Sequence, residues 1–168
     1  VNRGRVGLGT FDVAAELKAA ETVLAAARAG NDPFKGRTGD MERHYLLQGA
    51  NEVMPYRVYV PKAYKGEAMP LVIALHGLGA NEDSFFDSYG RVPPQLAEKH
   101  GFLMAAPLGY RVDGFYGSGL MGAGDAASRR RIEMSETDVL EVLRMMRAHY
   151  KVDESRIALD RGVAMKIN

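Results

Sequence analysis

The sequence predicts an α/β fold in which a mostly parallel sheet follows an antiparallel hairpin. Two aliphatic runs carry this prediction, residues 70–75 (PLVIAL) and 102–106 (FLMAA), because neither shows polar alternation. Strands of a parallel sheet that are covered on both faces have this composition. Helical patterns lie between the runs and after the second one. This order of elements, taken alone, fits several doubly wound folds.

Two segments in front of the aliphatic runs predict the hairpin. Residues 41–48 and 54–60 are separated by a Gly-Ala-Asn turn, and in the second segment large apolar side chains alternate with Arg57 and Tyr59. A period of two is typical of a strand with one buried face. A third buried strand is predicted over residues 156–159, where the sequence is again mostly aliphatic.

An Ala-rich stretch predicts an additional helix near the N-terminus, over residues 11–29, with Asp12 as its N-cap and Gly30 just after its end. Its apolar stripe is narrow, so we expect this helix to pack on the domain or on a partner chain. Residues 31–40 are rich in turn formers. The sequence thus predicts a helical extension and linker over 1–40 and the α/β domain over 41–168.

Two further helices are predicted inside the domain. Residues 84–100 have helical spacing, interrupted at Pro93 and Pro94 and stopped by Gly101. Ser135 is expected to cap a second helix, with Asp138 at its third position as in a capping box. The predicted apolar face of that helix consists of Val139, Leu140, Leu143, Met146 and Tyr150. Residues 108–133 show no periodicity and predict a long loop.

Composition and charge exclude several classes of function. The net charge is +1, so we expect no nucleic-acid or membrane-surface partner. The absence of cysteine excludes disulfides, thiolate metal sites and a cysteine nucleophile. None of the four histidines has metal-ligand spacing, and we expect neither metal nor cofactor. No apolar run is long enough for a membrane span, and the compartment stays open because secreted proteins can also lack cysteine.

The stretch with the clearest chemical meaning is His76-Gly77-Leu78-Gly79, directly after the first aliphatic run. Acyl transfer places negative charge on a carbonyl oxygen, and a backbone N–H aimed at that oxygen contributes about 3 to 4 kcal/mol. Glycines at 77 and 79 allow the backbone conformations that such a turn requires. The amide of Leu78 is then the natural donor, with Gly79 supporting the turn. A plain glycine-rich turn is the alternative, because many strand-to-helix turns have this composition.

The order of motifs resembles that of the α/β-hydrolase esterases, above all the feruloyl-esterase and polyhydroxyalkanoate-depolymerase-like group, also called prolyl-oligopeptidase-family hydrolases. The resemblance covers roughly residues 31–159. The motifs that carry it are 55–61 (PYRVYVP), 70–79 (PLVIALHGLG), 101–107 (GFLMAAP), 135–139 (SETDV) and 153–157 (DESRI).

This resemblance implies that 41–168 is the N-terminal portion of an α/β-hydrolase domain. Residues 70–76 would form its third strand and 102–106 its fourth, and the helix at 136–150 would precede the strand that carries the nucleophile. Leu78 would supply one oxyanion-hole amide. His76 would shape the loop, whereas the catalytic histidine of the family comes near the end of the chain.

The sequence departs from the family where the nucleophile is expected. Such enzymes have a G-x-S-x-G elbow after this strand, and none occurs in the 168 residues. The Ser, Asp and His of the triad are therefore not present in this chain. We favour a longer esterase that is truncated, frameshifted or mistraced after Leu159 over a shortened, inactive relative that serves as a binding or assembly module. A triad built on Ser118 is disfavoured because Ser118 does not follow a strand.

The resulting expectation is a serine carboxylic-ester hydrolase that acts on a small-molecule ester through an acyl-enzyme. Tyr110, Phe115 and Tyr116 are expected either to line the substrate pocket beside His76 and Gly77 or to anchor their own loop. A sheet cut after its fifth strand would have an open edge, which a second chain or a homo-oligomer would cover.

Overall fold

The computed structural model describes residues 12–114, 116 and 124–160, and the chain divides into two compact units. The first unit, Val1–Arg37, contains helix α1 (Val13–Arg28). Asp12 caps α1, since its carboxylate accepts the N–H of Ala15 at 3.0 Å, and Gly30 follows the helix with a φ of +71°. The predicted cap and stop are confirmed, and what α1 packs on stays a prediction.

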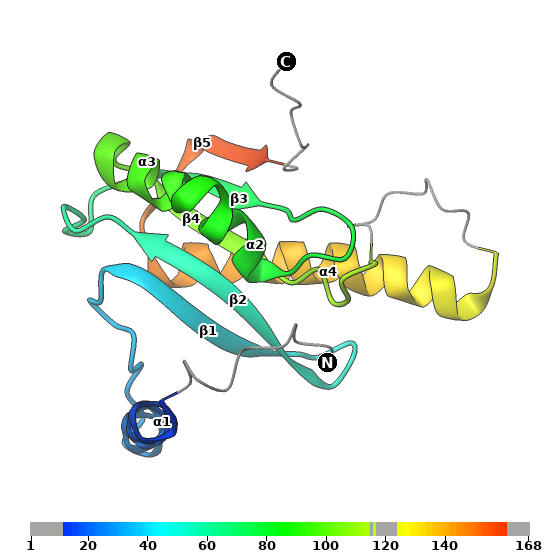
Figure 1. Ribbon diagram of the computed structural model, residues 1–168, viewed down its shortest axis with the longest axis horizontal. Coiled ribbons are helices and arrows are strands. Elements are labelled where there is room, and N and C mark those ends of the chain that lie inside the picture. Colours follow the sequence, from blue (N-terminus) through cyan, green and yellow to red (C-terminus); the bar gives the residue numbers. More distant parts are fainter. Residues whose placement is uncertain (1–11, 115, 117–123, 161–168) are drawn as a thin grey trace. The chain divides into compact units, whose positions relative to one another are not determined.

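The second unit, Thr38–Asn168, contains a five-stranded sheet with the order β1-β2-β4-β3-β5 (Figure 1). Its strands are β1 (Gly39–Leu47), β2 (Glu52–Val60), β3 (Met69–Ala74), β4 (Leu103–Pro107) and β5 (Val152–Asp160). β2 runs antiparallel to both β1 and β4, whereas β3 runs parallel to both β4 and β5. The predicted hairpin and the parallel strands behind it are confirmed.

Helices cover the two faces of this sheet (Figure 1). On one face lie α2 (Glu82–Asp87), a short 3₁₀ turn (Ser88–Gly90) and α3 (Val92–His100). On the other face lies α4 (Ala126–His149). The prolines fall in the first turn of α3, where a missing N–H costs nothing, and Gly101 ends that helix with a φ of +68°. The predicted interruption and stop are confirmed.

A hydrophobic core lies between the sheet and the helices α2 and α3. Phe86 of α2 and Ala97 of α3 pack with Ala74, Met104 and Ala106 of the sheet, and all five are at most 1% exposed. Complete burial of a phenylalanine side chain contributes about 2 to 3 kcal/mol. In β1 and β2 every second residue is buried, and the residues between them are exposed in β1 and mostly half-buried in β2. This alternation is the one that the sequence predicted for β2.

The start of α4 differs from the prediction. The helix begins at Ala126 behind the cap residue Asp125, whose carboxylate accepts the N–H of Ser128 at 2.6 Å. Ser135 and Asp138 are therefore not a capping box, and both are completely buried in the middle of the helix. Of the predicted apolar face, Met146 and Tyr150 are buried as expected, whereas Leu140 is 58% exposed. The buried stripe is Ser135, Asp138, Val142 and Met146.

The prediction that residues 156–159 form a buried strand was wrong. β5 exists and pairs with β3, but most of its side chains are exposed, including Leu159 at 51%. The physical reason is its place in the sheet, since an edge strand has one neighbour. An aliphatic sequence indicates the tendency to be buried, but whether a strand is buried depends on what covers it.

Arg57 of β2 connects the hairpin to α2 through a group of charges. Its guanidinium donates to both carboxylate oxygens of Asp40, at 2.8 and 2.7 Å, and to Asp83 and Asp87 of α2, at 3.1 and 3.0 Å. Arg91 contacts Asp40 and Asp87 as well. We call these five residues the Arg57 cluster. α2 begins directly after the loop of residues 76–80. By binding α2 to β2, the Arg57 cluster therefore fixes the position of the C-terminal end of this loop.

Candidate functional site

We call residues 76–79 the glycine turn. It lies at the carboxyl end of β3, and α/β folds bind ligands at this end of their parallel strands. Gly79 has a φ of +77°, a conformation that disfavours any side chain. Its N–H donates to the Val112 carbonyl at 3.0 Å, and the N–H of Ala80 donates to the Gly77 carbonyl at 3.1 Å. The amide of Gly79 is thus occupied by the loop that follows β4. The Leu78 side chain is 75% exposed, and its role as an oxyanion donor stays a prediction.

His76 is buried within this turn, with 9% of its surface exposed. Its Nδ1 lies 2.7 Å from the Gly77 carbonyl oxygen, and its Nε2 lies 2.7 Å from the Leu108 carbonyl oxygen. The ring also meets the edge of Tyr116 at a centroid distance of 5.2 Å. Both ring nitrogens therefore contact the backbone of the two loops, which agrees with a loop-shaping histidine.

Tyr116 connects the turn to α4. Its hydroxyl accepts the N–H of His76 at 3.1 Å, and its own N–H donates to the Ser135 hydroxyl at 2.9 Å. Burial raises the pKa of the Tyr116 phenol above its ordinary value. A Cβ atom on Gly109 would lie 2.4 Å from the Tyr116 ring, so only glycine fits there. These contacts favour the loop-anchor interpretation of Tyr116, and its contact with a substrate stays a prediction.

Asp138 is the second buried polar residue of α4 at this site. One carboxylate oxygen accepts the Tyr45 hydroxyl, and the other accepts the N–H of Tyr110 at 2.8 Å. Burial raises the pKa of the Asp138 carboxyl, and the bonds from Tyr45, Tyr110 and Gly109 offset part of that effect. The same burial and the neighbouring carboxylate raise the pKa of Tyr45.

Tyr110, in the loop after β4, contacts Arg111 and Glu52, the first residue of β2. Its ring lies 4.0 Å from the guanidinium carbon of Arg111, and its hydroxyl donates to Glu52 at 3.4 Å. Arg111 pairs with the same carboxylate at 2.8 Å. These contacts favour the loop-anchor interpretation of Tyr110, and its contact with a substrate stays a prediction. Phe115 and Ser118 lie outside the described residues.

The end of β5 lies beside the beginning of the glycine turn. The N–H of Leu75 donates to the carbonyl of Asp160 at 2.7 Å, so the residue that ends β5 neighbours the residue before His76. Ser135 and Asp138 were not predicted as site residues. Two polar side chains three positions apart on one helix face were the available signal, and it was read as a cap.

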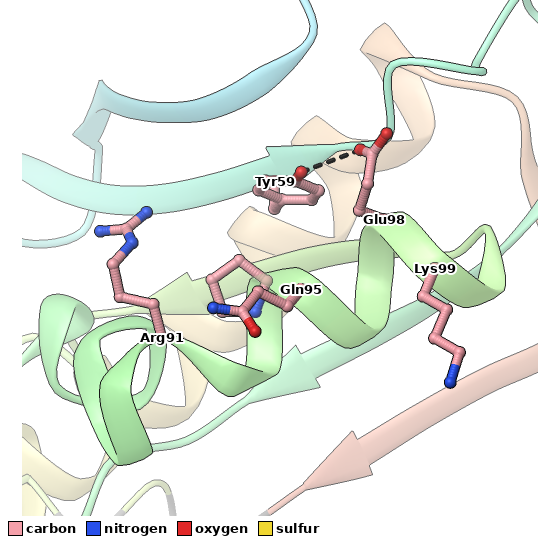
Figure 2. A pocket seen from close by; sticks show the side chains of 6 residues that line it. Tyr59, Arg91, Gln95, Glu98 and Lys99 are labelled. Atoms are coloured by element: carbon pink, nitrogen blue, oxygen red, sulfur yellow. Dashed lines mark hydrogen bonds between the residues drawn. The ribbon is translucent and has the colours of Figure 1, made fainter.

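A separate hollow of about 350 Å³ lies between β2 and α3 (Figure 2). Tyr59 and Glu98 both line it, and the tyrosine hydroxyl donates to the carboxylate at 2.8 Å. Tyr59 pairs with Met104 near the start of β4, whereas the glycine turn lies at the carboxyl ends of the parallel strands. This hollow is therefore not part of the candidate site.

Among the described residues, no group of three or more His, Asp or Glu side chains is arranged to hold a metal ion. Within the same part of the chain, no helix is long and apolar enough to cross a membrane.

Solved structures of ester hydrolases share this fold. A CE1 ferulic acid esterase from the anaerobic fungus Anaeromyces mucronatus matches with a TM-score of 0.52 and 20% identity, over 71% of this chain and 47% of that one. An S-formylglutathione hydrolase from Agrobacterium tumefaciens gives 0.56 and 19%, over 74% and 50%. A fluorophosphonate-binding serine hydrolase from Staphylococcus aureus gives 0.54 and 14%, over 74% and 47%.

These comparisons confirm the predicted fold, the α/β-hydrolase-type sheet with its N-terminal hairpin. The chain spans about half the length of the solved structures that it matches. No family model matches the sequence, and no curated protein sequence matches it either.

Proposed function

We propose that this chain, which has the fold of the α/β-hydrolase esterases, contributes half of an oxyanion hole to a serine carboxylic-ester hydrolase. The observation that carries the proposal is the glycine turn at the carboxyl end of β3, with Gly79 at a φ of +77° and the end of β5 beside it. An acyl-transfer site needs both parts, an inward-facing backbone amide and a nucleophile within reach of the same carbonyl carbon.

In this mechanism a serine hydroxyl attacks the ester carbonyl, and a histidine takes its proton. The carbonyl oxygen becomes negative, and the Leu78 N–H donates to it. The alcohol then leaves with that proton, and water releases the acid from the acyl-enzyme. Because G-x-S-x-G does not occur in the 168 residues, the nucleophile of this mechanism has to come from outside them.

A binding module is the second candidate function, and the mostly exposed side chains of β5 favour it. The same fold would then hold an ester or a polypeptide without cleaving it. The esterase and the binding module differ in whether a nucleophile is present. The test must therefore identify which polypeptide, if any, reacts with a reagent for nucleophilic serines.

The test combines intact-mass measurement with p-nitrophenyl acetate turnover and labelling by a fluorophosphonate. The enzyme proposal expects label and turnover on a larger or a second polypeptide, and none on a species of 18.4 kDa. Label on the 18.4 kDa species would refute the statement that the nucleophile is missing from these residues. No label on any species would favour the binding module.

The two glycines of the turn provide a matched pair for the oxyanion role. A Cβ at either position meets nothing within 4 Å, but only Gly79 has a positive φ. Gly79→Val should therefore abolish ester hydrolysis in the species that turns over, with the fold retained in circular dichroism, because a β-branched residue displaces the turn. Gly77→Ala, the control, should retain the fold. Unchanged activity in Gly79→Val would remove residues 77–79 from the oxyanion hole.

A further inference from the structure

Two buried polar side chains of α4, Ser135 and Asp138, have no role in the proposed chemistry. Both are 0% exposed, and their spacing of three residues places them on one face of the helix. A buried hydroxyl or carboxyl that lacks a partner costs about 1 to 3 kcal/mol, and a charged one costs more. An apolar residue would be the simpler choice at a contact between a helix and a sheet. Their partners therefore indicate what they do.

Both side chains hold the loop that follows β4. The Asp138 carboxylate accepts the N–H of Tyr110 at 2.8 Å and also bonds the N–H of Gly109. The Ser135 hydroxyl accepts the N–H of Tyr116 at 2.9 Å. These three bonds fix residues 109–110 and Tyr116 against the same helix.

The two tyrosines that are held in this way have strained backbones. Tyr110 has a φ of +64° and Tyr116 a φ of +49°, values that cost about 1 to 2 kcal/mol for a residue with a Cβ. Their N–H groups are the ones that Asp138 and Ser135 bind. Such strain persists only where the surroundings impose it. The α4 side chains therefore stabilise a loop conformation that the tyrosines would not adopt alone.

The held loop in turn contacts the glycine turn at three points. The Tyr116 hydroxyl accepts the His76 N–H, the Leu108 carbonyl oxygen lies 2.7 Å from His76 Nε2, and the Val112 carbonyl accepts the Gly79 N–H. Space is tight as well, because a Cβ on Gly114 would lie 2.6 Å from the Ser135 hydroxyl oxygen. A shift of this loop would therefore shift the turn.

We propose that Ser135 and Asp138 are positioning residues, which set the backbone of the 76–79 turn by holding residues 108–114 and Tyr116 against α4. The significance for catalysis rests on the proposed function, since a displaced Leu78 amide would no longer face the oxyanion. The mechanical connection itself does not depend on ester hydrolysis.

Amide hydrogen exchange of the full chain, resolved by residue with NMR, tests the connection. Ser135→Ala, Tyr116→Phe and Asp138→Leu should each speed the exchange of the His76 and Gly79 amides about tenfold, the effect of losing one hydrogen bond. Exchange in the β1–β2 hairpin should not change in Ser135→Ala and Tyr116→Phe, whereas Asp138→Leu also removes the bond from Tyr45 of β1. Thr137→Val is the matched control, because the Thr137 hydroxyl lies on the same helix but bonds only the Glu133 carbonyl, at 2.7 Å, among its described contacts.

Asp138→Asn is the conservative rescue. Its carboxamide oxygen can accept the Gly109 and Tyr110 amides while its NH₂ group donates to the Tyr45 hydroxyl, so exchange at His76 and Gly79 should stay near the wild-type rate. Should Asp138→Leu not fold, Ser135→Ala and Tyr116→Phe decide the question, because each removes one hydroxyl and leaves the packing almost unchanged.

If the His76 and Gly79 amides exchanged at the wild-type rate in Ser135→Ala and Tyr116→Phe, the proposal would be overturned. A rise of equal size in the β1–β2 hairpin would also overturn it, because it would indicate general destabilisation. None of these measurements uses ester turnover. A chain that shows the local effect but is part of no species that fluorophosphonate labels would refute the proposed function and support the positioning role.

Discussion

Replacing Arg57 with methionine should cost the second unit about 2 to 3 kcal/mol of unfolding free energy. The Arg57 side chain is 12% exposed and that of Asp40 is 22% exposed, and two short bonds join them. Removing one partner of a fully buried ion pair costs about 3 to 5 kcal/mol, whereas a surface pair contributes about 0 to 1 kcal/mol. The guanidinium carbon of Arg57 also lies 5.0 Å from the centroid of the Phe86 ring. Arg57→Met lies between these limits, because Arg91 still contacts Asp40 and a methionine side chain can still cover Phe86.

The assay is urea unfolding followed by circular dichroism, since urea leaves ion pairs unscreened. Arg144→Met serves as the control, because Arg144 is 63% exposed and pairs with Glu141 on the surface of α4. That variant should differ from wild type by less than about 0.5 kcal/mol. If Arg57→Met proved as mild as Arg144→Met, the reasoning that the Arg57 cluster holds α2 on the hairpin would be refuted.

The cost should also depend on pH. Burial by itself would raise the pKa of Asp40, but the hydrogen bonds from Arg57 and Arg91 outweigh burial and hold it below its ordinary value. Because the folded pKa is the lower one, Asp40 contributes stability above the unfolded value of about 4, and this contribution is lost as the pH falls through the folded pKa. The difference between wild type and Arg57→Met should therefore shrink as the pH falls from about 5 toward 2.

Two further predictions concern α4 and the site. Val142→Ala should lower the free energy of unfolding in urea by about 2 kcal/mol, because Val142 is 0% exposed. Leu140→Ala should lower it by less than about 0.5 kcal/mol, because Leu140 is 58% exposed. Equal losses would contradict the exposure of Leu140. Burial raises the pKa values of Tyr45 and Tyr116 above the ordinary tyrosine value of about 10, so both phenols should titrate at a higher pH than an ordinary tyrosine, and the stability they contribute should be lost as the pH rises through their folded pKa values. Ultraviolet titration with Tyr45→Phe and Tyr116→Phe would identify them, and a normal titration of either phenol would contradict its burial.

The sequence predicted those parts of the fold that depend on local pattern. The alternation in residues 54–60, the aliphatic run at 70–75 and the stop at Gly101 are properties of neighbouring residues, and the structure has β2, β3 and the end of α3 there. The glycine turn was predictable for the same reason, since a turn after a strand requires the residue types that form it.

What the sequence did not predict depends on distant partners. Ser135 and Asp138 are polar, so periodicity assigned them to the helix end, but Tyr45, Tyr110 and Tyr116 turn that polar pair into a buried anchor. The Tyr45–Asp138 bond joins residues that are 93 positions apart. The exposed side chains of β5 are a second case, because strand burial depends on neighbouring elements.

The strand order has a consequence for the order of folding. β1 and β2 are adjacent in sequence and are joined by a short turn. β3 and β5 are also neighbours in the sheet, but α2, α3, β4 and α4 separate them along the chain. Closing a longer loop costs more chain entropy, and non-local pairing slows folding. We therefore expect the hairpin to gain amide protection first and the β3–β5 ladder last in pulse-labelling refolding. The Leu75–Asp160 bond, which brings the end of β5 to the glycine turn, would then form in the last step, and simultaneous protection of both ladders would contradict this order.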